Sequence, residues 1–277
     1  MTEGAASRRL RAWGVVVLGC ALLAGCASRP PLPPPGAPVP LRADDPLVAT
    51  LLEGWSNRVA GRSGLRASVV LKLSSPDGER RLAQDVVLAR PARLRMEIQS
   101  FLVTAAVLVA DGSQYEYFQS IDRYHERGAV YPRLLFDIAG VPLTLDQAVA
   151  FLLGGPPLRV GLFVTGGERL PDGSVNLDLR DARERLARRL GFGPAGHLLR
   201  VEEWSAAGEL RWQVDYGRYR DVGDDPFAHT IEFEFPPLAS SATVAFRSVA
   251  LNPETPDATF ELALPPEEPA GEEGQEP

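Results

Sequence analysis

Apolar and polar residues alternate along most of the chain between residues 44 and 264. Leu94, Met96 and Ile98, for example, are separated from one another by charged side chains. A period of two places the apolar side chains on one face of a β-strand. Turn signals such as the Pro-Asp-Gly sequence at residues 171–173 separate many of these runs. The pattern predicts about ten or eleven strands in mostly sequential hairpins, and therefore a mainly β fold built on an antiparallel sheet.

Two segments follow helical spacing instead. Acidic residues 44 and 45 precede an apolar stripe that continues to about residue 60, and Thr144 precedes a second stripe that ends at the Gly-Gly-Pro-Pro sequence of residues 154–157. Polar residues just before such stripes are typical helix N-caps. A curled antiparallel sheet closes only if the helices lie in its concavity. We therefore expect a few helices and a single curled antiparallel sheet, which form a half-open β-barrel with an α-helical lid over an apolar cavity.

Three further segments carry local expectations. Residues 131–138 are expected to add a further turn or two of helix. Residues 182–190 have helical propensity but lie between strand-like runs, and we favour a strand there. Residues 102–110 are apolar on both faces of a strand, so we expect both faces to be covered.

The N-terminal 25 residues have the pattern of an export signal. Three arginines precede an uncharged run of residues 12–25, which is too short to cross a bilayer as a helix. The sequence LAGC at residues 23–26 resembles the bacterial lipobox, whose cysteine receives a diacylglycerol and further acyl chains such as palmitate. Cys26 is therefore the predicted lipidation site. The weaker match that ends at Cys20 lies inside the apolar run, and an ordinary signal without a lipid is the alternative.

The rest of the chain divides by composition. After the signal at residues 1–25, we expect a lipidated cysteine with a proline-rich tether at 26–43, a folded domain at 44–264 and an acidic, disordered tail at 265–277. The formal net charge of −7 offers no basic surface for nucleic acid, so no nucleic-acid partner is expected.

The motifs that would carry chemistry are weak. Residues 191–196 match GxGxxG, but a strand-like run follows the glycines where a dinucleotide site needs a helix, so we expect a hairpin turn. The three histidines are scattered, and neither an HExxH nor a GxSxG sequence is present. The sequence therefore predicts a protein without a catalytic site, cofactor or metal.

Large apolar side chains at alternating strand positions and on the second helix are the candidate ligand site. An ordinary core is the alternative for each of them, but a sheet lined in this way and covered by helices is also how an acyl-chain pocket is built. The predicted cavity-lining residues are Leu94, Met96, Ile98, Val149, Leu152, Leu153, Trp212, Val214, Tyr216, Ile231, Phe233, Val244 and Phe246.

The order of these features resembles the LolA/LolB family of Gram-negative bacteria. The local likeness is strongest in GVPLTL at residues 140–145 and FLLGGP at 151–156, where a Gly-x-Pro start leads into a lid helix that ends in Gly-x-Pro. The resemblance implies a LolA/LolB-like half-barrel that holds acyl chains. LolB is itself an outer-membrane lipoprotein, which agrees with a lipid on Cys26.

The resemblance also implies partners and an address. The expected cargo is an acylated lipoprotein or a phospholipid, the delivery partner is a periplasmic LolA-like carrier, and the location is the periplasmic side of the outer membrane. LolB inserts an exposed leucine of a protruding loop into the membrane; the matching place here is Phe101 and Leu102, on a shorter connection, which are the predicted membrane-contact residues. The alternative is a non-transferring envelope sensor or assembly scaffold whose cavity is filled by its own lid.

Overall fold

One antiparallel sheet contains every strand in the computed structural model, which describes residues 36–100, 103–156 and 160–262. Fourteen strands lie in this part of the chain. Their bounds are β1 Val39–Arg42, β2 Gly64–Ser75, β3 Gly78–Ala89, β4 Arg93–Ser100, β5 Val103–Ala110, β6 Gln114–Gln119, β7 Tyr124–Ala129, β8 Phe163–Arg169, β9 Val175–Arg180, β10 Leu186–Phe192, β11 Leu198–Trp204, β12 Leu210–Val222, β13 Asp225–Phe235 and β14 Ser240–Leu251.

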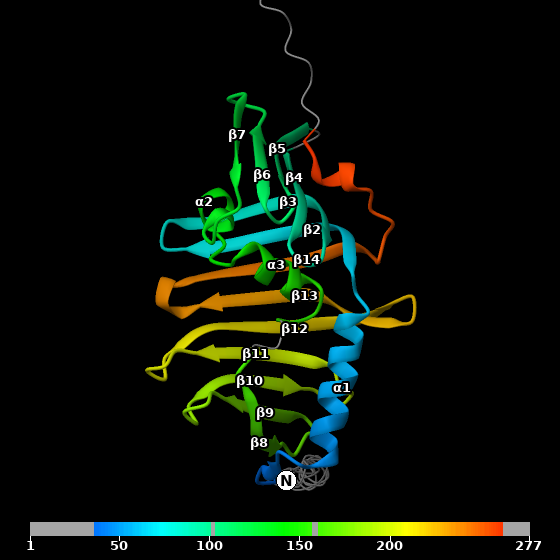
Figure 1. The fold of residues 1–277 in the computed structure, drawn as a ribbon, viewed down its shortest axis with the longest axis vertical. Helices are drawn as coiled ribbons and strands as arrows, with labels where there is room; N and C mark the ends of the chain where they lie inside the picture. Colours follow the sequence, from blue (N-terminus) through cyan, green and yellow to red (C-terminus); the bar gives the residue numbers. More distant parts are fainter. Residues whose placement is uncertain (1–35, 101–102, 157–159, 263–277) are drawn as a thin grey trace, which may run out of the picture. The chain divides into compact units, whose positions relative to one another are not determined.

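The sheet consists of two runs of sequential hairpins joined side by side. Strands β8 to β14 follow one another in space, β14 pairs with β2, and β2 to β7 follow in turn. Strands β1 and β7 are the two edges and do not pair with each other, so the sheet stays open. Figure 1 shows that β4 to β7 run across the direction of the other strands, so the sheet is strongly curled. The predicted fold class, a mainly β half-open barrel with a helical lid, is confirmed.

The α-helices of the described residues lie on one face of the sheet (Figure 1). They are α1 Pro46–Ala60, α2 Leu134–Ala139 and α3 Leu145–Leu152, and short 3₁₀ turns form η1 Pro236–Leu238 and η2 Asp257–Phe260. The Asp45 side chain caps α1 by accepting a hydrogen bond from the Leu47 amide at 2.9 Å. At α3, the Thr144 amide donates to Gln147 Oε1 at 3.1 Å, as in a capping box. Among the described residues, no helix combines the length and apolar character needed to cross a membrane.

The core lies between the helices and the inner face of the sheet. Trp55 of α1 contacts Phe192 of β10 edge to face, with ring centroids 6.5 Å apart. Phe151 of α3 makes the same kind of contact with Trp212 of β12 and Phe233 of β13, at 5.1 Å and 5.5 Å. Such aromatic pairs contribute about 0.5–1.5 kcal/mol each beyond their burial. Large aromatic side chains therefore anchor α1 and α3 on the sheet.

The structure has more strands than the sequence predicted. Strands β1, β7 and β8 carry weak alternation because much of their length is exposed, and β6 has a single buried residue, Tyr115. Strand β1 pairs with β8 and lies within the segment 26–43 that the sequence indicated as a tether.

The structure also tests the local predictions for residues 182–190, 191–196 and 102–110. Strand β10 covers residues 186–192, so the favoured strand over 182–190 is confirmed from residue 186 on, while a turn precedes it. The GxGxxG sequence ends β10 and continues into the turn before β11, as expected for a hairpin. In β5, Leu108 and Val109 point to opposite faces and both are buried, as expected for a strand covered on both sides.

Candidate functional site

A cavity of about 80 Å³ lies between the lid and the inner face of the sheet. Every lining residue except Gln84 is apolar. The helical side of the lining comes from α2, α3 and the segment between them, and consists of Leu135, Ala139, Val141, Leu143, Ala148, Val149 and Leu152. The sheet side comes from β2, β3, β4, β13 and β14, and consists of Leu65, Val69, Leu71, Gln84, Val86, Leu94, Met96, Phe233, Ala242, Val244 and Phe246.

The volume of the cavity indicates a closed lid. Sites that hold drug-sized or larger ligands have volumes of roughly 300–1,000 Å³. A space of about 80 Å³ is far below that range. An acyl chain would therefore enter only if the lid moved away from the sheet.

Seven of the thirteen residues predicted to line a cavity do line this one. They are Leu94, Met96, Val149, Leu152, Phe233, Val244 and Phe246. The other six lie around it: Ile98 is half-buried on β4, Leu153 ends the lid helix, and Trp212, Val214, Tyr216 and Ile231 lie on β12 and β13. On the side of β12, the fully buried Phe151 side chain occupies the space beneath the lid, where it packs on Trp212 and Phe233. Cys26, Phe101 and Leu102 lie outside the described residues.

The predicted lining residues did not include the wall that β2 and β3 provide. Leu65, Val69 and Leu71 alternate clearly along β2, so the sequence carried the signal for an inward face but not for its position under the lid. Gln84 was missed because a single polar residue on an inward face only interrupts the alternation. The pairing of β14 with β2 brings Val69 opposite Phe246, which joins the two ends of the chain in one wall.

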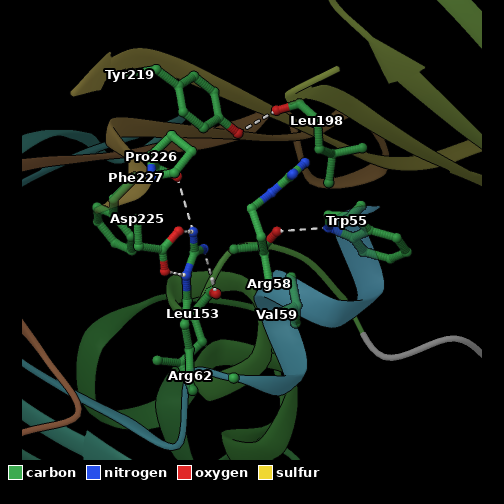
Figure 2. A network of polar contacts seen from close by, with 12 residues as sticks. Trp55, Arg58, Val59, Arg62, Leu153, Leu198, Tyr219, Asp225, Pro226 and Phe227 are labelled. Carbon is green, nitrogen blue, oxygen red and sulfur yellow. Dashed lines mark hydrogen bonds and ion pairs between the residues drawn. The ribbon is translucent and has the colours of Figure 1, made fainter. Parts of the chain in front are cut away.

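A group of polar contacts fixes the C-terminal end of α3 (Figure 2). The buried Arg62, just after α1, donates from Nε and Nη2 to the two carboxylate oxygens of Asp225, both at 2.7 Å. Its Nη1 donates to the Leu153 carbonyl at 3.0 Å, and Nη2 also donates to the Pro226 carbonyl at 2.9 Å. Trp55 Nε1 donates to the Gly154 carbonyl at 3.1 Å. We call these contacts the clasp.

The two glycines after α3 make the clasp possible. Gly154 and Gly155 have φ angles of 112° and 145°, a region that favours glycine. A Cβ atom at Gly155 would lie 2.8 Å from the Trp55 ring, and one at Gly154 would collide with the Arg62 guanidinium. The Gly-Gly sequence that ends the lid helix therefore allows α1 to approach the backbone closely.

Two partly buried titratable groups, Tyr219 and His197, lie beside the clasp. The Tyr219 hydroxyl donates to the Leu198 carbonyl at 2.5 Å, and burial raises the pKa of this phenol to about 12 although Arg62 and Arg58 favour its charged form. The His197 ring stacks on Tyr219 at 4.6 Å, and burial together with Arg58 lowers its pKa. Within the described residues, no group of three or more His, Cys, Asp or Glu side chains lies together as a metal site would need.

Comparison with known proteins rests on structure, since no protein-family model and no curated protein matches the chain. A LolA superfamily protein from Nitrosomonas europaea has a TM-score of 0.53 at 14% identity, over 77% of this chain and 97% of that one. A domain from Vibrio parahaemolyticus described as outer membrane lipoprotein-sorting has a TM-score of 0.51 at 10% identity, over 76% and 94%. A DUF1329 family protein from Desulfovibrio piger has a TM-score of 0.52 at 11% identity, over 78% and 98%.

An open, curled antiparallel sheet with helices over an apolar cavity defines a half-open barrel with a helical lid. The three similar structures align with this chain over 94–98% of their own length, and one of them is a LolA superfamily protein. The chain therefore has a LolA/LolB-like fold.

Proposed function

We propose that this protein binds acyl chains in the cavity beneath α2 and α3, as an outer-membrane lipoprotein that faces the periplasm and receives lipoproteins or phospholipid from a LolA-like carrier. The observation that carries the proposal is the apolar lining of the cavity by both the lid and the sheet. The lipoprotein-sorting description of the Vibrio parahaemolyticus domain supports the class of cargo. Binding of this kind makes and breaks no covalent bond.

The lid opens at the α2 side in this proposal. The clasp fixes the far end of α3 through hydrogen bonds to Leu153 and Gly154. Helix α2 has six residues and contributes Leu135 and Ala139 to the cavity lining. Contacts between apolar side chains can be exchanged for contacts with an acyl chain at little cost in free energy, because both are apolar. An acyl chain would thus replace α2 on the sheet while α3 stays attached.

Native mass spectrometry tests the proposal directly. Residues 27–277, exported to a bacterial periplasm without the lipidated cysteine, are expected to retain phospholipid or acylated peptide, or to take up an added diacylated lipopeptide. The control is an unacylated peptide of the same sequence, which should not bind. A protein that stays ligand-free with both peptides would contradict acyl binding.

A second candidate function is a non-transferring sensor or assembly scaffold. The small volume of the cavity, about 80 Å³, favours it, because the lid already fills the space that a ligand would need. In that case the ligand-free form is the functional one, and the mass spectrometry experiment distinguishes the two candidates.

Exposed apolar side chains next to the predicted membrane-contact residues support an additional contact with a bilayer. Val103 is 65% exposed at the start of β5, and Ile121 is 78% exposed in the turn after β6. Ser120 joins the turn after β6 to the start of β5, because its amide donates to the Ala105 carbonyl at 2.9 Å and its hydroxyl to the Thr104 carbonyl at 2.6 Å. Apolar groups gathered on one end of a molecule are typical of an interaction site. We therefore propose that Val103 and Ile121 enter the bilayer together with Phe101 and Leu102.

The double substitution Val103→Glu and Ile121→Glu is expected to weaken binding to phospholipid vesicles by at least about tenfold. Burying one Val or Ile side chain contributes about 1.5–3 kcal/mol, and a charge in its place opposes insertion. The measurement is co-flotation of the unlipidated protein with vesicles. Leu238→Glu, in η1 and at a side chain 46% exposed, is the matched control and should leave binding unchanged. Equal losses in both variants would contradict the assignment of this end as the membrane contact.

A further inference from the structure

Gln84 is the one polar residue among those that line the cavity. Its side chain is 4% exposed and lies on β3, between Val69 of β2 and Ile98 of β4. In the part of the chain that the structure describes, its amide nitrogen Nε2 is buried without a hydrogen-bond partner. Buried polar groups in folded proteins are almost always paired, so this amide requires an explanation.

The fold gives no reason for a polar side chain at this position. The next inward-facing residues along β3 are Val86 and Leu88, and both are buried among apolar neighbours. An unpaired amide in such surroundings costs free energy that a side chain such as methionine would not. Residues that lower the stability of the fold, with no compensating structural contact, are expected at functional sites. A ligand that accepts a hydrogen bond from Nε2 would provide the compensating contact.

The position of Gln84 on β3 indicates what kind of ligand this is. Every second residue of β3 faces inward, and burial increases along these positions from the exposed Arg80 through Gln84 to the fully buried Leu88. The Arg80 guanidinium lies at the edge of the lid, because a Cβ atom on Gly140 would be 3.1 Å from its Nη2. The amide thus lies between a wholly apolar interior and a charged rim. An acyl ester or amide has the same order of parts, with a hydrocarbon chain, a carbonyl and a polar head.

We propose that Gln84 Nε2 donates a hydrogen bond to the carbonyl oxygen of an acyl ester or amide whose hydrocarbon chain occupies the cavity. The inference rests on the proposed function and deepens it, because it names the chemical group that is recognised besides the chain. Diacylated lipoproteins and phospholipids share this carbonyl. A hydrocarbon chain joined to its head group through an ether lacks this carbonyl and offers only the weaker acceptor of the ether oxygen.

The test compares an acyl lysophospholipid with its alkyl-ether analogue of equal chain length and head group. The wild-type protein is expected to bind the ester about three- to tenfold more tightly than the ether, as one hydrogen bond in a buried site predicts. Gln84→Met is expected to bind the ether as the wild type does and to lose the preference for the ester. A wild type that binds both equally, or a variant that keeps the preference, would overturn the inference.

The outcomes separate this inference from the function on which it rests. If neither lipid binds to the wild type, acyl binding itself fails. If both bind with equal affinity, the carbonyl contact alone fails. If the wild type prefers the ester and Gln84→Met does not, the carbonyl contact is supported. Displacement of the bound ester by a diacylated lipopeptide or by a diacyl phospholipid then identifies the source of the carbonyl.

Thermal unfolding without ligand gives a second measurement. Gln84→Met removes the unpaired amide at nearly constant volume and is expected to raise the melting temperature by about 2–8 °C. Gln114→Met, at the exposed start of β6, is the matched control and should change it little. A lower melting temperature in Gln84→Met would mean that the amide is already satisfied in the ligand-free protein, and would overturn the inference.

Discussion

Arg62→Met is expected to lower the free energy of unfolding by about 3 kcal/mol. Removing one partner of a buried ion pair leaves the other charge without compensation, which typically costs about 3–5 kcal/mol. The lower end applies because the Asp225 side chain remains 29% exposed and keeps some hydration. The substitution also removes the donors to the Leu153 and Pro226 carbonyls.

Urea denaturation of the unlipidated protein measures this effect. Arg58→Met is the matched control, because Arg58 lies one turn earlier on α1 and donates a single hydrogen bond of 3.0 Å, to the Gly196 carbonyl. It should cost about 1 kcal/mol. Equal losses of stability in the two variants would show that the clasp does not fix the lid.

Ala242→Leu is expected to weaken acyl binding by at least about tenfold while the protein stays folded. Ala242 lines the cavity from β14, and a leucine adds three carbon atoms to a space of about 80 Å³. The ligand then has to share that space with the new side chain, and overpacking of this kind costs roughly 1–3 kcal/mol in well-packed interiors. The free protein has room for the leucine, so its melting temperature should not fall.

Displacement of a fluorescent acyl probe measures the loss. Ala245→Leu places the same side chain on the opposite face of the same strand and should bind the probe as the wild type does. If Ala242→Leu binds the probe with unchanged affinity, the acyl chain lies elsewhere and the cavity is ordinary core.

The fold follows from local patterns that are continuous in the sequence. Alternation in β2, β4 and β13 and the caps of α1 and α3 are visible from a few neighbouring residues, because strands and helices impose their periods locally. The strands that were missed have exposed faces, as in β7, where few apolar residues mark the buried side. Exposure, more than length, decided which strands could be predicted.

The site depends on contacts between distant residues, which a single sequence does not display. Arg62 and Asp225 are separated by 163 positions, and nothing in either neighbourhood indicates their pairing. The unpaired amide of Gln84 could not be predicted either, because a glutamine at an inward position becomes informative only when its surroundings are known. Phe151 was expected to belong to the lid, but its packing on Trp212 decides where the cavity ends.

The two edges of the open sheet bear on aggregation. An exposed edge strand is a template on which another molecule can add its own strand. Strand β1 has four residues, and one of them is Pro40, which has no N–H to donate to an incoming strand. Strand β7 carries Glu126 and Arg127 near its middle. Short length and a proline therefore protect the β1 edge, and charged side chains protect the β7 edge. Both features disfavour the pairing of edge strands between crowded copies of the protein.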